Sequence, residues 1–490
     1  MASKLSRRTV LGRTLGIAGA VLAAACGAPT PSPGSGPTAP AAGATTAPPT
    51  SSSGAGAAAT TPPPNPTTVT AATKPASAAG SPIELHYVTQ LQPETQSWKD
   101  AAVVIDSFMQ ANPGITVVTE HVAFANLDTK LVTAARAGAP PDVSEVSDSF
   151  PQLAKGGYLL QLDQFVNDTK LDLKDYYEGK LQTCYIDNKL VALPITADCR
   201  GLWWNMKILN DAGFSQPPTY WDDLADVAQK VTKNGVSGWG IQGGNQGFMI
   251  CEQFSAFFIQ NDGKIISDDQ TKAMTDQPEW ITGATFWQDL TTKLKVTQPS
   301  ASTDDHNAVF SLFAQGKIAM FPGGPWSRSD IERNNPNLTF GKDFSVSVLP
   351  YPKGKHPGTC QGGWLQSVWS GSKVQEATLK FLGHYHTTEN IAQSAASAMP
   401  TRRSSTKLPP FNDPWYAPFW DTMPYARPPM PTMAATSEIS TALYALLQSM
   451  LLGQQTADAA GKAFAQDVNE RILPKYAPTA LGTSCGCPEV

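Results

Sequence analysis

The sequence predicts an α/β protein of two lobes. Between residues 83 and 147, strand and helix patterns alternate with short connections, which is typical of a parallel sheet with right-handed crossovers. Residues 83–490 also form a segment longer than one ordinary hydrophobic core can organise, so we expect two lobes.

The first strand and the first helix follow from the spacing of apolar residues. Ile83, Leu85 and Tyr87 alternate along IELHYVTQ (residues 83–90), the period of a strand. A helix follows and ends at Asn112-Pro113-Gly114, where proline and glycine disfavour further helix. The apolar face expected for this helix consists of Trp98, Ala102, Ile105 and Met109.

Two further strands complete this pattern. The β-branched run ITVVTEHV (115–122) predicts the second strand, and PPDVSEVS (140–147) predicts the third. The helix between them carries Leu127, Leu131 and Ala135 on one face and ends at Gly138. Ligands of such sheets lie beyond the carboxyl ends of the strands. Here those ends carry polar side chains: Thr89, Gln90, Gln92, Ser147, Asp148 and Ser149.

The first 26 residues have the layout of a bacterial export signal. Basic residues precede an apolar run, Leu15 to Ala25, that is too short to span a bilayer as a helix. Adjacent Arg7 and Arg8 resemble a twin-arginine signal, and the small residues before Cys26 resemble a lipoprotein processing site. We therefore expect Cys26 to carry a lipid anchor; a cleaved, soluble protein is the alternative.

Residues 27–82 predict a disordered tether between Cys26 and the folded part. All of them except Asn65, Val69 and Lys74 are Ala, Gly, Pro, Ser or Thr, so the segment has almost nothing to bury. A flexible chain of this length has an r.m.s. reach of roughly 40 Å.

Charge argues against nucleic acid as a partner. The chain carries −5, of which residues 1–26 contribute +4 and Lys74 +1, so residues 83–490 carry −10 (−5 − 4 − 1). No basic stripe is available there to neutralise phosphates. All twelve tryptophans lie in this region, and so many flat side chains suit both a core and a ligand pocket.

Six cysteines follow Cys26, and export permits disulfides. Six thiols allow fifteen full pairings, among which the sequence does not choose. Cys184 and Cys199 flank a short extended stretch and could form a bridge. For Cys485-Gly-Cys487, a disulfide or free thiols are preferred to a metal site because no second ligand pair is near in the sequence.

Several catalytic motifs are missing from the sequence. It contains no Gly-x-Ser-x-Gly, no His-Glu-x-x-His, no Walker loop and no Gly-x-Gly-x-x-Gly. His384 and His386 form a lone His-x-His pair with no further ligand signal, so surface or packing roles are preferred to a metal site. A transport function would therefore need separate permease and ATPase subunits.

A series of motifs carries a family resemblance over residues 83 to about 475. In order these are AARAGAPPDV, DNKLVALPITADCRGLWWNMKILNDAGFSQPPTYWDDL, FAQGKIAMFPGGPWSRSDI, LPYPKG, KFLGHYHTTEN and MPTRR. Their order and spacing resemble those of extracellular solute-binding proteins of ABC transporters, the family-1 sugar-binding group.

This resemblance implies a type II periplasmic-binding-protein fold, with two α/β lobes, a hinge and an interlobe ligand cleft. It divides the chain into lobe 1 (83–195 plus 361–400), lobe 2 (196–360 plus 401–478) and a tail (479–490). The chain would cross between the lobes near Pro194–Ala197, Gly358–Gly363 and Met399–Arg403. The residues themselves add that KLVALPI (189–195) reads as a strand that breaks at Pro194.

A sugar site needs an aromatic platform and planar polar side chains, because a pyranose has an apolar face and a rim of hydroxyls. The resemblance assigns Trp326, in Gly323-Gly324-Pro325-Trp326, to stacking on the sugar, and it assigns Gly363 and Trp364 to the cleft wall. It also assigns Asp148 to a polar position after the third strand. The alternative for Trp326 is a core tryptophan, for Gly363 and Trp364 packing at the hinge without ligand contact, and for Asp148 a helix cap.

Further binding residues are expected from their place in the chain. Asp198 and Arg200 lie where the chain would enter lobe 2, and an arginine fork suits adjacent hydroxyls or a carboxylate. They could equally pair with each other. Four more residues fall in loops expected to face the cleft: Gln92, Gln246, Glu252 and Trp415.

We therefore expect a substrate-binding lipoprotein of an ABC importer that captures a mono- or oligosaccharide between two lobes and delivers it to a membrane permease with a separate ATPase. We expect a monomer on the extracytoplasmic face, with the lipid anchor as its only membrane contact and with no catalysis, cofactor or metal.

Two alternatives stay open at this point. One is a binding protein for a polyol phosphate, a polyamine or a peptide; Arg328, Arg402 and Arg403 keep an anionic ligand open. The other is a secreted glycoside hydrolase that uses Asp142 with Glu145 or Asp148.

Overall fold

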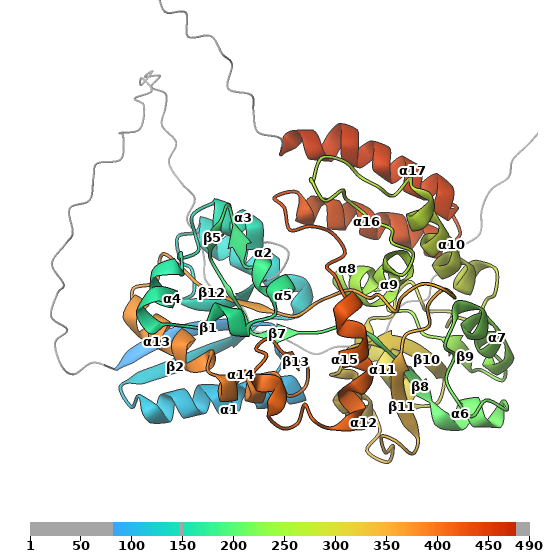
Figure 1. The fold of residues 1–490 in the computed structure, drawn as a ribbon, viewed down its shortest axis with the longest axis horizontal. Coiled ribbons are helices and arrows are strands. Elements are labelled where there is room, and N and C mark those ends of the chain that lie inside the picture. Colours follow the sequence, from blue (N-terminus) through green and yellow to red (C-terminus); the bar gives the residue numbers. More distant parts are fainter. Residues whose placement is uncertain (1–81, 147–149, 477–490) are drawn as a thin grey trace, which may run out of the picture. The chain divides into compact units, whose positions relative to one another are not determined.

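The structure is a computed structural model that describes residues 82–146 and 150–476 (Figure 1). Cys26, the tether, Asp148, the pair Cys485 and Cys487 and the tail lie outside the described residues. Within the described ranges, no helix is both long enough and apolar enough to cross a membrane.

The first sheet has five strands in the order β2-β1-β3-β12-β6. β1 (Ile83–Thr89) pairs in parallel with β2 (Ile115–His121) and with β3 (Val143–Val146), which confirms the predicted parallel arrangement. β12 (Leu365–Val368) returns from far along the chain and pairs antiparallel with β3 and with β6 (Leu193–Pro194).

The first two helices connect these parallel strands. α1 (Gln96–Ala111), which lies beside β1 and β2 in Figure 1, begins at Thr95, whose hydroxyl accepts a hydrogen bond from Trp98 N. Its buried apolar side chains are Ala101, Val104, Ile105 and Phe108. Of the predicted face, Ile105 is buried, and Trp98 and Met109 are partly buried and pack against the same core cluster. The prediction was wrong at Ala102, which is half-buried, because the buried row of the helix runs through Ala101, Val104 and Phe108 instead. α2 (Phe124–Arg136) buries Leu127, Leu131 and Ala135 as predicted.

The segment KLVALPI does not form one strand. β5 (Lys189–Leu190) pairs with β4 (Tyr185–Ile186), and β6 joins the first sheet. The turn between β4 and β5 holds Asp187 at φ 50° and Asn188 at φ 60°, the left-handed conformation of a tight hairpin. Because β5 pairs with β4 in this hairpin and β6 pairs with β12 in the first sheet, the single strand expected over KLVALPI is divided into β5 and β6.

The second sheet has the order β11-β8-β10-β9. β8 (Gly201–Asn205) pairs antiparallel with β10 (Ile318–Gly323) and β11 (Phe344–Val348), and β9 (Ser237–Trp239) pairs in parallel with β10. Large aromatic side chains fill the core on this side of the molecule, and those fully buried include Trp203, Trp239, Trp280 and Trp287.

The other helices follow in chain order: α3 (Phe150–Lys155), α4 (Asp163–Thr169), α5 (Glu178–Gln182), α6 (Met206–Asp211), α7 (Trp221–Val231), α8 (Gln246–Phe248), α9 (Ser255–Ile259), α10 (Pro278–Thr292), α11 (His306–Ala314), α12 (Ser327–Asn334), α13 (Gln375–Tyr385), α14 (Thr388–Ser394), α15 (Ala417–Thr422), α16 (Thr436–Leu451) and α17 (Ala457–Asp467).

The three segments predicted to cross between the lobes lie side by side. β7 (Thr196–Ala197) pairs antiparallel with β13 (Met399–Pro400), and Asp198 forms an antiparallel bridge with Gly362. Trp364 N also donates to Thr196 Oγ1 at 2.9 Å. The residues at which one lobe passes into the other stay a prediction.

The bridge that Cys184 and Cys199 could have formed is not present. Both are buried free thiols in separate hydrophobic clusters, whereas Cys251 is joined to Cys360. The sulfur of Cys199 faces Phe419 O at 3.3 Å, and that of Cys184 faces Lys180 O at 3.8 Å.

Candidate functional site

A cleft of about 600 Å³ lies where the first sheet, the second sheet and the three adjacent segments meet. The loops beyond the carboxyl ends of β1 and β3 form one wall, as expected for a sheet of this type. Residues of α8, α11 and α12 contribute the other wall, together with the segment Pro428–Thr432. The segment Cys360–Leu365 lines the base between these walls.

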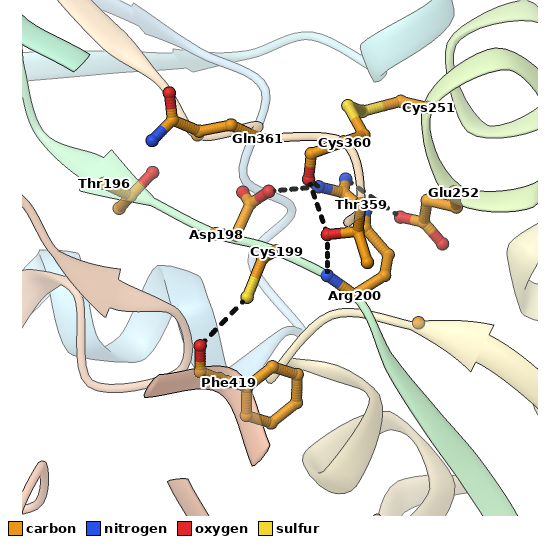
Figure 2. Close-up of polar contacts among 12 residues, drawn as sticks. Thr196, Asp198, Cys199, Arg200, Cys251, Glu252, Thr359, Cys360, Gln361 and Phe419 are labelled. Carbon is orange, nitrogen blue, oxygen red and sulfur yellow. Dashed lines mark hydrogen bonds and ion pairs between the residues drawn. A yellow bond between two sulfur atoms is a disulfide. The ribbon is translucent and has the colours of Figure 1, made fainter. Parts of the chain in front are cut away.

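A buried charged centre lies in this lining (Figure 2). Arg200 and Asp198 are 5% and 4% exposed, and Arg200 Nη1 donates to Asp198 Oδ1. Arg200 Nη2 lies 3.7 Å from Oε1 of Glu252, which is 1% exposed. One guanidinium therefore bridges two carboxyl groups, and the predicted alternative that Asp198 and Arg200 pair with each other is confirmed.

Burial shifts the protonation of this centre. It raises the pKa of Glu252 to about 8, which the positive charge of Arg200 partly opposes. Lys180 Nζ donates to Gly363 O at 2.7 Å, and burial lowers the pKa of this amine, against the attraction of Asp198. The side chains of the centre can thus present both donors and acceptors to a ligand near neutral pH.

A second buried carboxyl group belongs to the first sheet. Glu145 of β3 accepts hydrogen bonds from Gln90 N at 3.0 Å and from the hydroxyl of Tyr87 at 3.2 Å. Burial raises its pKa to about 7, and these hydrogen bonds oppose the rise.

Two half-buried indoles complete the lining. The guanidinium carbon of Arg200 lies 5.4 Å from the ring centroid of Trp326, and a Cβ at Gly324 would come within 2.2 Å of that indole. Glycine thus lets the ring lie against the backbone. Trp364 contacts Phe124 edge to face, with ring centroids 5.6 Å apart.

Gly363 shows why the base of the cleft needs glycine. Its φ is +105°, and a Cβ there would lie 2.1 Å from Thr196 O. Only glycine allows these two segments to approach so closely.

The structure brings seven of the predicted site residues to the cleft: Gln92, Asp198, Arg200, Glu252, Trp326, Gly363 and Trp364. Their role in binding a ligand stays a prediction.

Two expected site residues do not line the cleft. Gln246 does not line the cleft, although its neighbours Asn245 and Gly247 do. It lies at the start of α8, where successive side chains point in directions about 100° apart. Trp415 packs instead on Tyr416, with centroids 3.9 Å apart, and faces the guanidinium of Arg328.

Five further charged residues of the lining were not found from the sequence: Glu94, Lys180, Asp305, Asp330 and Arg333. Lys180 is a single lysine in the short helix α5, and Asp330 of α12 forms an ion pair with Arg333, whose Nη2 lies 2.9 Å from Asp330 Oδ1. Their contribution depends on how distant segments meet.

Three residues that suggested an anionic ligand or a hydrolytic site lie outside the cleft lining: Arg402, Arg403 and Asp142. Arg402 Nε lies 2.6 Å from Asp175 Oδ2, and Arg403 faces the ring of Tyr177, so neither lines the cleft. The nominated hydrolytic residue Asp142 accepts hydrogen bonds from His86 N and Ser372 Oγ, and it does not line the cleft either. No group of three or more potential metal ligands occurs within residues 82–146 and 150–476.

Comparisons with known proteins agree on one family. Residues 90–391 match the family described as bacterial extracellular solute-binding protein. A relative from Brucella abortus (strain 2308), named as a binding protein, is 27% identical over 362 residues, which cover 72% of this chain and 85% of the relative. The maltotriose-binding protein of Pyrococcus abyssi (strain GE5 / Orsay) is 25% identical over 297 residues, 59% of this chain and 60% of the relative.

A solved structure extends the likeness to the fold. The ABC transporter solute binding protein from Thermotoga lettingae TMO, bound with α-D-tagatose, superposes with a TM-score of 0.70 and 27% identity. The match covers 80% of this chain and 99% of that one. The fold is therefore the predicted type II periplasmic-binding fold, and the chain belongs to the bacterial extracellular solute-binding protein family.

Proposed function

We propose that the chain is the receptor of an ABC importer and that it captures an uncharged mono- or oligosaccharide in the cleft. The observation that carries the proposal is the combination, in one cleft, of two half-buried indoles with the buried charged centre around Arg200. Indole faces complement the C–H face of a pyranose, and the charged groups complement its hydroxyls. The names of the relatives, which mention maltotriose and tagatose, support this class of ligand.

The charges of the cleft favour an uncharged ligand over an anionic one. Each Lys or Arg among the described lining residues already has a partner: Arg200 with Asp198, Arg333 with Asp330, and Lys180 with Gly363 O. Six lining residues are acidic: Glu94, Glu145, Asp198, Glu252, Asp305 and Asp330. A phosphate or uronate would therefore lose its hydration without gaining a free cation.

The bound ligand would be delivered to the permease through closure of the lobes, without any covalent chemistry. A ligand that contacts both walls only in the closed form shifts the population toward that form by its differential affinity. We propose that a membrane permease with a separate ATPase recognises the closed form. We also propose that Cys26 anchors the chain by lipid to the extracytoplasmic face of the membrane, so that Cys26→Ser should move it from the membrane fraction to the soluble fraction.

A second candidate ligand is a polyamine, because the acidic residues of the lining lie among aromatic side chains. Fewer carboxylates are free than this count suggests, since Asp198 and Asp330 are paired and burial raises the pKa values of Glu145 and Glu252. We therefore rank this candidate second.

A thermal-shift screen of the purified full chain tests the proposal, because a ligand stabilises the state that it binds. The panel contains D-tagatose, maltose, maltotriose, D-glucuronate, glycerol 3-phosphate and spermidine. We expect stabilisation by a neutral saccharide that chromatography then recovers intact. Stabilisation by glycerol 3-phosphate, D-glucuronate or spermidine alone would overturn the saccharide assignment, and recovery of hydrolysis products would indicate an enzyme.

A further inference from the structure

The Cys251–Cys360 disulfide joins the two segments that hold the charged centre (Figure 2). Cys251 directly precedes Glu252 in the π-helical turn Met249–Phe254, and Cys360 lies at the base of the cleft. Their Cα atoms are 5.4 Å apart although 109 positions separate them in the sequence. Both cysteines line the cleft.

The segment around Cys360 holds Arg200. Its backbone oxygen accepts a hydrogen bond from Arg200 Nη1 at 3.3 Å. The neighbouring Thr359 Oγ1 accepts one from Arg200 N at 3.2 Å. The position of the guanidinium is therefore set from this segment as well as by Asp198.

Glu252, on the other side of the disulfide, has no comparable support. Among the described residues neither of its carboxyl oxygens has a partner in good hydrogen-bond geometry: Arg200 Nη2 is 3.7 Å away, and the nearby amide of Gln242 favours the charged form without meeting that geometry. A buried carboxyl group with such weak polar contacts is costly, so its place depends strongly on the backbone that carries it. The disulfide ties that backbone to the segment that holds Arg200.

We propose that the disulfide is a positioning element of the ligand site: it keeps the Glu252 carboxyl group at the Arg200 guanidinium and, through that contact, sets the affinity for the ligand. The effect on affinity rests on the proposed function, whereas the positioning of Glu252 does not. The test therefore has one readout without ligand and one with it.

The variant is Cys251→Ser/Cys360→Ser, made in the full chain after peptide mapping without reductant has confirmed the disulfide in the unmodified chain. Leu290→Ala in α10 is the matched control, since Leu290 is buried in a core cluster and does not line the cleft. It lowers stability without touching the charged centre. If the serine variant does not fold, Cys251→Ala/Cys360→Val replaces the sulfurs with apolar groups.

The readout without ligand is the pKa of Glu252, followed by ¹³C NMR and assigned with Glu252→Gln. Besides burial, the charged groups that act on this carboxyl group are Arg200, Asp198 and Asp330. We expect the pKa to change by about half a unit or more in the serine variant, because the distance to Arg200 changes, and to stay unchanged in Leu290→Ala. An equal pKa with and without the disulfide would overturn the proposal.

The readout with ligand is the dissociation constant for D-tagatose and maltotriose, measured by calorimetry in a double-mutant cycle. We expect about tenfold weaker binding in the serine variant and little further loss when Glu252→Gln is added to it, because both changes remove the same contact. If the serine variant and Glu252→Gln each weakened binding and their fold-losses multiplied in the combined variant, positioning through Glu252 would be contradicted. If neither sugar binds the unmodified chain, the proposed saccharides fail, and the pKa readout alone decides the positioning.

Discussion

Gly363→Ala should destabilise the protein by more than an ordinary substitution of a left-handed glycine. The positive φ of +105° alone costs an alanine about 1–2 kcal/mol. The new Cβ would also lie 2.1 Å from Thr196 O, so backbone has to move, which adds about 1–3 kcal/mol as overpacking does elsewhere. The expected loss of unfolding free energy is therefore about 2–5 kcal/mol.

The matched control is Gly213→Ala. Gly213 has a φ of +89°, and a Cβ there would meet nothing within 4 Å, so only the conformational cost of about 1–2 kcal/mol remains. Urea unfolding of both variants at one temperature gives the two losses, provided that their m values agree with that of the unmodified chain. The difference between the variants measures the contact between the adjacent segments.

Equal losses for Gly363→Ala and Gly213→Ala would refute the reasoning, because the close approach of Gly363 to Thr196 would then carry no energetic consequence. A large loss for Gly363→Ala should also be accompanied by weaker ligand binding, measured by calorimetry at a temperature where the variant is fully folded. Both segments line the cleft, so a shift between them moves its wall.

Three further predictions concern single side chains. Trp326→Ala should weaken saccharide binding by about 2 kcal/mol, or roughly thirtyfold, because a stacking platform is lost, whereas a large loss of stability without loss of affinity would identify a core residue instead. Since burial raises the pKa of Glu145 to about 7, its contribution to stability is complete below its unfolded pKa and declines as the pH rises to about 7. Relative to Glu145→Gln, the unmodified chain should therefore lose up to about 3 kcal/mol between pH 4.5 and 8 in urea titrations, and a constant difference would contradict this. Asp175→Ala leaves the largely buried Arg402 without its carboxylate partner and Ser404 without the acceptor of its N and Oγ, and it should cost about 3 kcal/mol in urea unfolding. The exposed pair of Asp226 with Lys230 should cost under about 0.5 kcal/mol on Asp226→Ala, and similar losses for the two variants would show that burial of the first pair is unimportant.

The order of elements in the first sheet was predictable because it depends on local patterns. The alternation in β1, the apolar spacing in α2 and the β-branched run of β2 are all written in neighbouring residues. The same local reasoning failed at KLVALPI, where a hairpin with two left-handed residues competes with a continuous strand. For α1 it succeeded in part: Ile105 is buried as predicted, whereas Ala102 is not, because the buried row lies one residue away, at Ala101, Val104 and Phe108.

The candidate site was predictable only in part. Trp326 and Trp364 were found from their motifs, and the structure places both in the cleft lining. Trp415 was assigned from its expected loop position and packs elsewhere, since its partner Tyr416 and the facing Arg328 offer a competing surface. Lys180 was missed because a single lysine in a short helix carries no pattern.

Composition and periodicity alone thus sufficed for the α/β class, the parallel strands and the expectation of an export signal with a tether, because each depends on residues close together in the chain. The tertiary structure alone decided that Cys251 pairs with Cys360 and that Asp198, Arg200 and Glu252 meet at the base of a cleft. Those contacts join segments from distant parts of the chain, and their free energy depends on burial and on the approach of other backbone, quantities that exist only once the lobes have folded.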